Sequence, residues 1–314
     1  MAFDLRGRTS DGKRVVCIRS SPASKSPESP AQNARRTGHP ILVWGESMSQ
    51  PPTATNQTAL ITGASGGIGY EVAKLFAKDH HNVVLVARGA DKLTQFAGEL
   101  QRQFGVSTKA VPLDLTAAPA PQFLFDQLQR EGVAVDILVN NAGYGVLGEF
   151  AKVSPEENLG QIQLNVIALT HLTKLFLGPM IERHSGKILN VASTAGFQPG
   201  PLMAVYYATK AYVISFSEAL ANELSGSGVT VTCLCPGPTA TSLQERAGME
   251  NTRLVKTLRP MDAKTVARDG YRGLMADKTL VISGFRNWLL AESVRFSPRK
   301  LVTAISRKVL DKAE

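Results

Sequence analysis

The sequence is poor in the residue that would support a disulfide framework. Three cysteines occur in 314 residues, and they are Cys17, Cys233 and Cys235. Since Cys233 and Cys235 stand two positions apart in an apolar run, a strand would turn both side chains the same way, and we expect them to pack rather than to bind metal. This sparse use of cysteine fits a reducing compartment, and we expect a cytoplasmic protein.

Long apolar runs and metal-binding patterns are also scarce. No apolar run approaches the length of a membrane span, so we expect no integral membrane segment. His171 and His184 have no partner at the spacing of metal ligands, and we predict no metal site. The net charge is +9, but there is no interleaving of aromatic and basic residues and no nucleic-acid motif. The charge therefore indicates a solvated surface rather than binding to nucleic acid.

Residues 1–55 are rich in Ser, Pro and Arg and show no sustained periodicity, which predicts a disordered N-terminal extension. Three interpretations stay open: a targeting segment, a disordered extension, or an upstream stretch read from too early a start codon. The acidic Asp4, Asp11 and Glu28 argue against a transit peptide, and no apolar core of a signal peptide is present. Met48 stands just before the patterned part of the chain, which favours a mis-assigned start.

From residue 56 onward, apolar strand-like runs alternate with helix-like periodicity. This alternation predicts one α/β domain over 56–285, with a doubly wound, seven-stranded parallel Rossmann-like sheet whose ligands bind beyond the carboxyl ends of the strands. We predict strands near 57–62, 82–87, 107–112, 135–140, 186–192, 228–234 and 278–282, and helices near 67–79, 91–104, 120–131, 156–182 and 205–225.

The remaining residues, 286–314, predict a basic amphipathic helical extension. Pro298 interrupts the pattern, so we expect two short helices rather than one. We favour packing on the protein's own domain or on a second subunit over contact with a membrane surface.

The stretch TALITGASGGIG at 58–69 runs from an apolar strand through a glycine-rich loop into a helix start. Glycine allows a tight turn and a close approach of the backbone to a ligand, and the N–H groups of a helix start attract phosphates. The spacing G-x-x-x-G-x-G differs from the standard dinucleotide fingerprint. Taken alone, such a loop could also be a plain flexible turn.

Further motifs follow in order: NNAG at 140–143, Ser193, Tyr206 with Lys210 four residues on, and PG at 236–237. Together with TGASGGIG at 62–69 they resemble the short-chain dehydrogenase/reductase family over residues 56 to 285. This resemblance implies that a dinucleotide cofactor is bound by Gly63, Ser65, Gly67, Ile68, Gly69, Arg88, Asp114, Asn140, Ala142, Tyr206, Lys210, Pro236, Gly237, Thr239 and Thr241. In the family the acid at Asp114 contacts the adenine ring, and Asn140 would lie beside the cofactor.

Arg88 stands at the end of the second predicted strand, where a dinucleotide fold that binds NAD usually places an acid. An arginine pairs with a 2′-phosphate, whereas a carboxylate would repel it. The sequence therefore predicts NADP(H) as the cofactor.

Tyr206 and Lys210 are four residues apart, so a helix places both on one face. An ammonium near a phenol favours the phenolate and lowers its pKa toward neutrality, which improves general acid–base catalysis. The family resemblance implies that Tyr206 donates a proton to the substrate oxygen, that Lys210 tunes Tyr206 and binds the nicotinamide ribose, and that Ser193 orients the carbonyl. It also implies that Asn165 supports a proton relay through water.

The favoured function is transfer of a hydride between NADP(H) and an apolar ketone, aldehyde or secondary alcohol. Two alternatives stay open, an epimerase or dehydratase of related fold and a non-catalytic NADP(H)-binding regulatory protein. We expect residues 240–262 to cover the substrate, with a hydrophobic lining from Met249, Leu254, Val255 and Leu258. A homo-oligomer is a further expectation.

Overall fold

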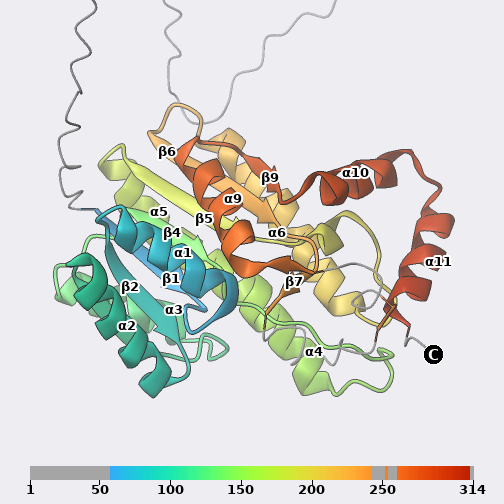
Figure 1. Cartoon of the computed structure of the whole chain (residues 1–314), viewed down its shortest axis with the longest axis horizontal. Helices are drawn as coiled ribbons and strands as arrows, with labels where there is room; N and C mark the ends of the chain where they lie inside the picture. The colour runs from blue at the N-terminus through green and yellow to red at the C-terminus, as the bar shows by residue number, and fades with distance from the viewer. Residues whose placement is uncertain (1–56, 242–251, 254–259, 312–314) are drawn as a thin grey trace, which may run out of the picture. The chain divides into compact units, whose positions relative to one another are not determined.

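Seven parallel strands form the centre of the structure, in the order β3-β2-β1-β4-β5-β6-β9 (Figure 1). The protein is described by a computed structural model, which covers residues 57–241, 252–253 and 260–311. The strands are β1 (Thr58–Thr62), β2 (Asn82–Ala87), β3 (Thr108–Pro112), β4 (Ile137–Asn140), β5 (Gly186–Val191), β6 (Val229–Cys235) and β9 (Leu280–Ile282). The chain moves outward from β1 to β3 and then returns to β4 on the other side of β1. The predicted α/β, doubly wound, seven-stranded parallel sheet is therefore confirmed, and its order reverses at β1 and β4.

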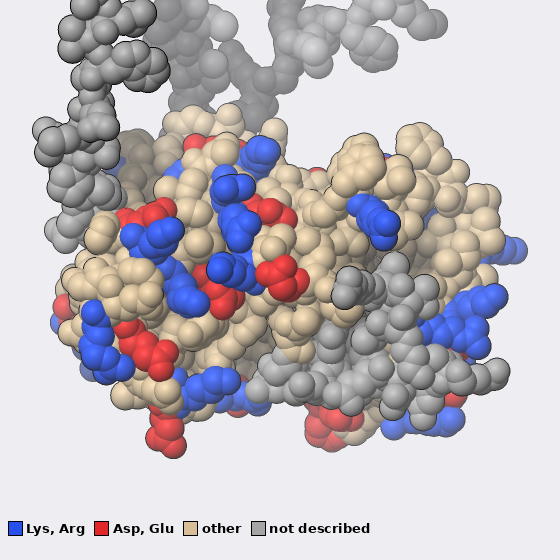
Figure 2. Space-filling model, viewed as in Figure 1, with Lys and Arg blue, Asp and Glu red and all other residues tan. Residues whose placement is uncertain are grey.

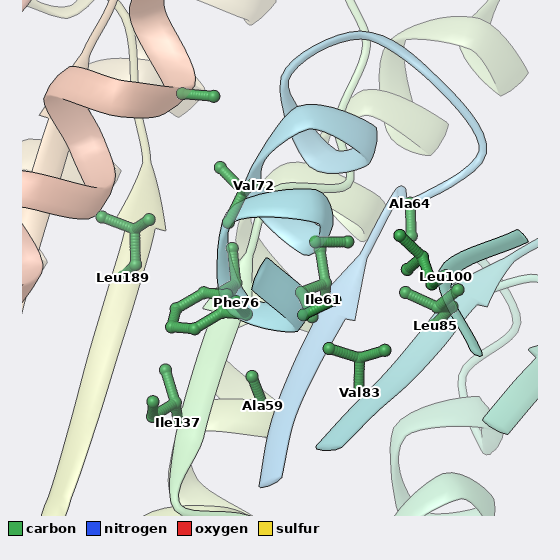
Figure 3. Close-up of a cluster of buried hydrophobic side chains, with 14 of the residues drawn as sticks. Ala59, Ile61, Ala64, Val72, Phe76, Val83, Leu85, Leu100, Ile137 and Leu189 are labelled. Carbon is green, nitrogen blue, oxygen red and sulfur yellow. The ribbon is translucent and has the colours of Figure 1, made fainter. Parts of the chain in front are cut away.

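Alternate residues of each strand belong to two separate cores, because successive side chains of a strand point to opposite faces. On one face, Ile61 and Leu85 pack under α1 (Gly67–Lys78), α2 (Ala90–Phe104) and α9 (Ala263–Met275), as Figure 3 shows around Phe76. On the other face, Leu60 and Leu138 pack under α3 (Ala120–Arg130), α5 (Leu169–Glu182) and α6 (Ala204–Glu223). Helices on both faces explain why these strands are almost continuously apolar.

The helix predicted over 156–182 is not a single α-helix. It begins as α4 (Pro155–Ile162), where the Ser154 side chain accepts a hydrogen bond from the Glu157 N–H and Pro155 stands in the first turn. It then widens into a π-helical turn, η1 (Gln163–Ala168), before continuing as α5. Periodicity could not predict this turn, because one π turn within a long helix leaves the apolar pattern on either side intact.

The same stretch corrects the expectation that no run approaches the length of a membrane span. Pro155–Glu182 is one helical stretch of 28 residues that is apolar enough to cross a membrane by length and composition alone. In the fold, its Leu172, Phe176 and Met180 are buried against the sheet. A core helix passes the same test, so the stretch carries little weight as a sign of membrane insertion.

The chain after β6 differs most from the prediction. A small parallel sheet of β7 (Thr239–Ala240) and β8 (Met261–Asp262) was not expected. The pocket-lining residues predicted between these strands, Met249, Leu254, Val255 and Leu258, lie outside the described residues. So does the N-terminal extension predicted over 1–55.

Two helices form the C-terminal end of the described chain. They are α10 (Phe285–Ser293), followed by a single 3-10 turn η3 (Val294–Phe296), and α11 (Arg299–Leu310). Pro298 stands directly before α11, so the predicted break into two helices is confirmed. All described residues belong to one compact unit that spans residues 50–314.

Candidate active site

A cavity of about 690 Å³ lies at the carboxyl ends of the strands. Its volume falls in the range of small-molecule and cofactor sites. Most of the predicted site residues line it, namely Gly63, Ser65, Gly67, Ile68, Arg88, Asp114, Ala142, Ser193, Tyr206, Lys210, Pro236, Gly237, Thr239 and Thr241. Three predicted residues, Gly69, Asn140 and Asn165, are not part of the lining.

The glycine loop after β1 can exist only without side chains at two of its positions. Gly63 has φ +67° and Gly67 has φ +55°, which is the left-handed region that disfavours other residues. A Cβ atom at Gly63 would lie 2.7 Å from Asn141 Nδ2, and one at Gly67 would lie 3.0 Å from Thr241 Cγ2. Gly66, at the start of α1, supplies no capping side chain, so the first N–H groups of the helix are left for an anionic ligand.

Gly69 lies in α1, where it packs against the glycine loop and does not line the cavity. A Cβ atom at Gly69 would lie 2.5 Å from both Gly63 O and Asn141 Nδ2. Only a glycine allows α1 to approach the loop this closely. The structure thus gives Gly69 a packing role, and its predicted contact with the cofactor stays a prediction.

The two asparagines of the NNAG motif point in different directions and have different hydrogen-bond partners. The Asn140 side chain is 3% exposed and points into the core, where Nδ2 donates to Thr173 Oγ1 at 3.0 Å and to Asn190 Oδ1 at 2.9 Å. Asn190 Nδ2 in turn donates to Ser217 Oγ at 3.0 Å. Asn140 is thus part of a buried polar chain that joins β4, β5, α5 and α6, and its predicted place beside the cofactor stays a prediction.

Asn141 takes the place expected for Asn140. Its Nδ2 donates to Thr62 O at 2.9 Å and to Gly63 O at 3.2 Å, which fixes the start of the glycine loop. The Thr62 hydroxyl accepts hydrogen bonds from the backbone N–H groups of Asn141 and Ala142, both at 3.0 Å. These contacts join the ends of β1 and β4 at the point where the strand order reverses.

Two basic residues border the end of the cavity next to β2. Arg88 follows β2, and Lys92 lies in the first turn of α2 with its Nζ 3.9 Å from a Cβ atom built on Gly66. Neither forms an ion pair with any other residue that the structure describes. The sequence analysis did not predict Lys92 as a site residue, although a second basic residue only four positions after Arg88 could have suggested it.

Asp114 lines the cavity and also closes a turn. Its Oδ1 accepts hydrogen bonds from the Thr116 N–H at 2.9 Å and from the Thr116 hydroxyl at 2.8 Å. Partial burial opposes ionisation, but these hydrogen bonds and the charge of Arg88 outweigh it and lower the pKa of Asp114. The structure therefore holds Asp114 as a carboxylate in a fixed position at the cavity wall, and its contact with an adenine ring stays a prediction.

Tyr206, Lys210 and Ser193 line the cavity together, and the Tyr206 and Ser193 side chains are hydrogen-bonded. Lys210 is 5% exposed; its Nζ donates to Val191 O at 2.8 Å and lies 5.8 Å from the centre of the Tyr206 ring. The Ser193 hydroxyl accepts from the Ala195 N–H at 3.1 Å. Gly145 packs on the other side of Tyr206, since a Cβ atom there would lie 2.8 Å from Tyr206 Cδ2.

Burial dominates the ionisation of this group. It raises the pKa of Tyr206, and hydrogen bonding with Ser193 opposes the rise only in part. Burial also lowers the pKa of Lys210 to about 8, with a small opposing effect of Cys233 and Cys235. The expectation that Lys210 would lower the pKa of Tyr206 is therefore not met, because both groups are desolvated and the ammonium faces the ring.

Asn165 lies in the π-helical turn η1 and is fully engaged with its neighbours. Its Oδ1 accepts from the Tyr144 N–H at 3.1 Å, and its Nδ2 donates to Tyr144 O at 2.9 Å and to Thr209 Oγ1 at 3.0 Å. A Cβ atom on Gly143 would lie 2.9 Å from Asn165 Oδ1 and 3.5 Å from Lys210 Nζ, so both side chains pack against the loop that follows β4. Asn165 holds this loop in place; its role in a water relay stays a prediction.

The outer part of the cavity is built by residues that the sequence analysis did not assign to the site. One face of α10 and α11 supplies a largely apolar wall of Leu290, Val294, Leu301, Val302, Ile305 and Val309. Tyr207 lines the same region, and burial raises its pKa to about 12, with the buried Ser306 of α11 opposing the rise. The apolar spacing at 301, 305 and 309 was visible, but nothing local in the sequence shows what such a face packs against.

The cysteines behave as expected. Cys233 and Cys235 are buried in β6 with their Sγ atoms 3.8 Å apart, on the side of the strand that packs under α6. Within the described residues there is no group of three or more His, Cys, Asp or Glu side chains that could hold a metal ion.

Comparison with known proteins adds independent information. Residues 57–252 match the family described as short chain dehydrogenase. A ketoacyl reductase of Nostoc sp. is 37% identical over 185 residues, which are 59% of this chain and 64% of that protein. The very-long-chain 3-oxoacyl-CoA reductase of Homo sapiens is 36% identical over 212 residues, which are 65% of this chain and 66% of that protein. The chain thus spans about two thirds of the length of these curated relatives.

A solved structure also resembles the fold closely. It is a short-chain dehydrogenase from Sphingobium yanoikuyae in complex with NADPH, with a TM-score of 0.69 and 34% sequence identity. The match covers 76% of this chain and 93% of that one.

Proposed function

The chain belongs to the short-chain dehydrogenase family, and from that premise we propose that it is an NADP(H)-dependent reductase of apolar carbonyl compounds. The observation that carries the proposal is the meeting of Ser193, Tyr206 and Lys210 in the same cavity as the glycine loop of β1. A bound nicotinamide would supply the hydride, which no side chain can do. The residues of the chain position the carbonyl and deliver the proton.

Near neutral pH the ionisation of the site leaves a proton donor for the reduction of a carbonyl group. Since the pKa of Tyr206 is raised, its phenol keeps its proton at neutrality and can donate it to the oxygen that receives negative charge. Ser193, whose hydroxyl is fixed by the Ala195 N–H, is placed to hydrogen-bond the same oxygen. Lys210, with a pKa of about 8, is mostly charged at pH 7 and stabilises negative charge that develops nearby.

NADP(H) is the cofactor that the charges support. Arg88 and Lys92 present two cations at the end of the cavity beyond β2, where a dinucleotide fold places the adenosine ribose. A 2′-phosphate would pair with both, whereas the 2′-hydroxyl of NAD(H) gains little from them. The solved relative from Sphingobium yanoikuyae holds NADPH, which is consistent with this proposal.

The substrate class follows from the wall that α10 and α11 build. Leu301, Val302 and Ile305 offer an apolar surface to the part of a substrate that extends away from Tyr206. Apolar chains bind such a surface because water is released from both. The names of the Nostoc and human relatives, a ketoacyl reductase and a 3-oxoacyl-CoA reductase, make 3-oxoacyl compounds the first substrates to test.

The test is NADPH oxidation with a panel of 3-oxoacyl thioesters, aryl ketones and aldehydes, for the parent and for Tyr206→Phe. We expect turnover to fall by about 10²–10⁴-fold, the contribution of a positioned general acid, while NADPH binding is unchanged. Tyr207→Phe is the matched control, since it removes a hydroxyl from the neighbouring residue and should keep most of the turnover. Full activity of Tyr206→Phe would contradict the assignment.

The same panel separates the alternative functions. An epimerase or dehydratase would convert its substrate without net consumption of NADPH. A regulatory NADP(H)-binding protein would bind NADPH and oxidise none of it with any carbonyl compound.

A further inference from the structure

The C-terminal helices expose an unusual amount of apolar surface. Among the described residues, seven of the fifteen large hydrophobic side chains that are exposed lie in the short stretch of α10, η3 and α11, and the other eight are distributed over the rest of the fold. The seven are Phe285, Trp288, Leu289, Leu290, Phe296, Leu301 and Ile305. The exposed fraction reaches 88% for Phe296 and 74% for Phe285. Exposed apolar residues are ordinary when scattered, but a cluster of this kind marks a contact surface.

Each face of α10 has a different environment. Ala291 is buried, and Asn287 and Leu290 line the cavity. Phe285, Trp288 and Leu289 lie outside the cavity lining, and the rings of Phe285 and Trp288 stack with centroids 5.7 Å apart. In Figure 1, α10 and α11 form one end of the described chain, away from α2 and α3. The outer apolar face is therefore open to a partner.

Basic side chains surround this apolar surface. Residues 285–311 carry six, all of them exposed, against the two acids Glu292 and Asp311: Arg286, Arg295, Arg299, Lys300, Arg307 and Lys308. Each acid pairs with one arginine, in Glu292–Arg295 and Arg307–Asp311, both at 3.3 Å. In the part of the chain that the structure describes, the other four basic residues have no acidic partner. Figure 2 shows uncharged and basic side chains over this end of the molecule.

The cavity opens on this same surface. Leu290, Leu301 and Ile305 line the cavity and are also 53–54% exposed, so they form an apolar rim between the interior and the outside. An apolar molecule could enter the cavity along this rim without first passing through bulk water. The surface and the cavity entrance are continuous.

We propose that α10 and α11 dock the protein on an anionic membrane surface, so that the cavity entrance faces the lipid. Helices with Trp, Phe and Leu on one side and Lys or Arg beside them bind at the boundary between headgroups and acyl chains. Anionic lipids attract each basic residue near the surface, and the unpaired cations of α10 and α11 supply this attraction. Phe285, Trp288 and Leu289 would enter the boundary, and Arg299 and Lys300 would contact lipid phosphates.

A second copy of the chain fits this surface less well. In a two-fold contact the same patch occurs on both partners. The basic residues of one copy would then face those of the other, and only two acids are present to offset them. A planar anionic surface complements the apolar and the basic residues at once.

The test uses the full chain with Trp44→Phe, which leaves Trp288 as the one remaining tryptophan. Vesicles of phosphatidylcholine alone are compared with vesicles of phosphatidylcholine and phosphatidylglycerol. We expect a blue shift of Trp288 emission and co-sedimentation with the anionic vesicles, both reduced by high salt. Because Trp288 reports its own surroundings, binding through residues 1–47 alone would leave the emission unchanged, and that result would overturn the proposal.

Two variants and their controls locate the contact. Phe285→Ser with Leu289→Ser, and separately Arg299→Glu with Lys300→Glu, should each weaken binding to anionic vesicles at least tenfold. None of these four residues lines the cavity. The matched control is Phe150→Ser with Lys152→Glu, which changes a 67% exposed phenylalanine and a nearby lysine elsewhere on the surface.

The control should bind as the parent does, and all variants should keep the melting temperature. Equal binding of all variants would overturn the proposal. So would a parent that ignores vesicles but forms a dimer that Phe285→Ser dissociates in light scattering, since the surface would then serve a second copy. The readouts do not depend on turnover, so failure of the proposed reductase activity would leave this result standing.

Discussion

Replacing Gly69 by alanine should damage the cofactor site without touching the cavity. The added Cβ atom would lie 2.5 Å from Gly63 O, where ordinary contacts begin at 3.4 Å. Asn141 Nδ2 lies at the same distance and is held by its hydrogen bonds to Thr62 O and Gly63 O. The glycine loop or α1 must therefore move by about 0.5–0.9 Å to relieve the overlap, and overpacking of this kind costs about 1–3 kcal/mol. For a domain of this size that corresponds to a fall of roughly 2–12 °C in the melting temperature.

The displaced loop should also bind the dinucleotide more weakly. Losing one backbone hydrogen bond to a phosphate would cost about 1.5 kcal/mol, and a cost of about 1.4 kcal/mol raises the dissociation constant tenfold. NADPH fluorescence titration and thermal unfolding, with and without NADPH, measure the two effects.

Gly66→Ala is the matched control. The nearest atom to its Cβ atom would be the flexible Lys92 Nζ at 3.9 Å, so the melting temperature of the apoprotein should stay near that of the parent. If Gly69→Ala bound NADPH and melted like the parent, the packing role of Gly69 would be refuted.

Three further predictions concern the charges and the wall of the cavity. Arg88→Asp should shift the ratio of kcat/KM values from NADPH toward NADH by at least tenfold, and an unchanged ratio would exclude Arg88 from cofactor selection. Lys210 has a pKa of about 8 in the fold, against an ordinary lysine pKa of 10.5, so between these values the unfolded chain binds more protons and stability rises with pH. Lys210→Met should therefore be more stable than the parent at pH 7 by an amount on the order of 3 kcal/mol, and this difference should shrink toward pH 10.5. Denaturant unfolding of the apoprotein measures it, and a difference that does not change with pH would show that burial does not lower the pKa of Lys210. Ile305→Trp should raise KM for large ketones while sparing small aldehydes in the NADPH assay, and equal effects on both would show that α11 does not bound the substrate.

The fold could be predicted because its signals are local and repeated. The apolar strands of the sheet and most of the helices between them appear in the sequence as alternating runs, although α9, between β6 and β9, was not predicted. The reversal at β1 and β4 follows from the family resemblance. The glycine loop and the pair Tyr206 and Lys210 could be found because fixed spacing along one loop or one helix determines their geometry.

The parts that could not be predicted depend on contacts between distant segments. Asn140 and Asn141 are adjacent in sequence, and only the direction of the strand end decides which one meets Gly63 and which one meets Asn190. The apolar face of α11 was visible as a pattern, but the residues that it covers lie about a hundred positions earlier, at Tyr206 and Tyr207. The ionisation of Lys210 depends on its burial, which spacing does not show.

The buried polar chain through Asn140, Asn190 and Ser217 has a consequence for how the sheet is assembled. A one-residue slip of β5 against β4 would break the hydrogen bond from Asn140 Nδ2 to Asn190 Oδ1 and leave Asn190 Oδ1 without this donor in an apolar interior. Leucines at these positions would tolerate a slip, whereas amides accept a single alignment. The three residues thus fix the register of β4 and β5 at the centre of the sheet. The register in turn fixes the relative positions of Asn141 and Ser193, which follow the ends of these two strands.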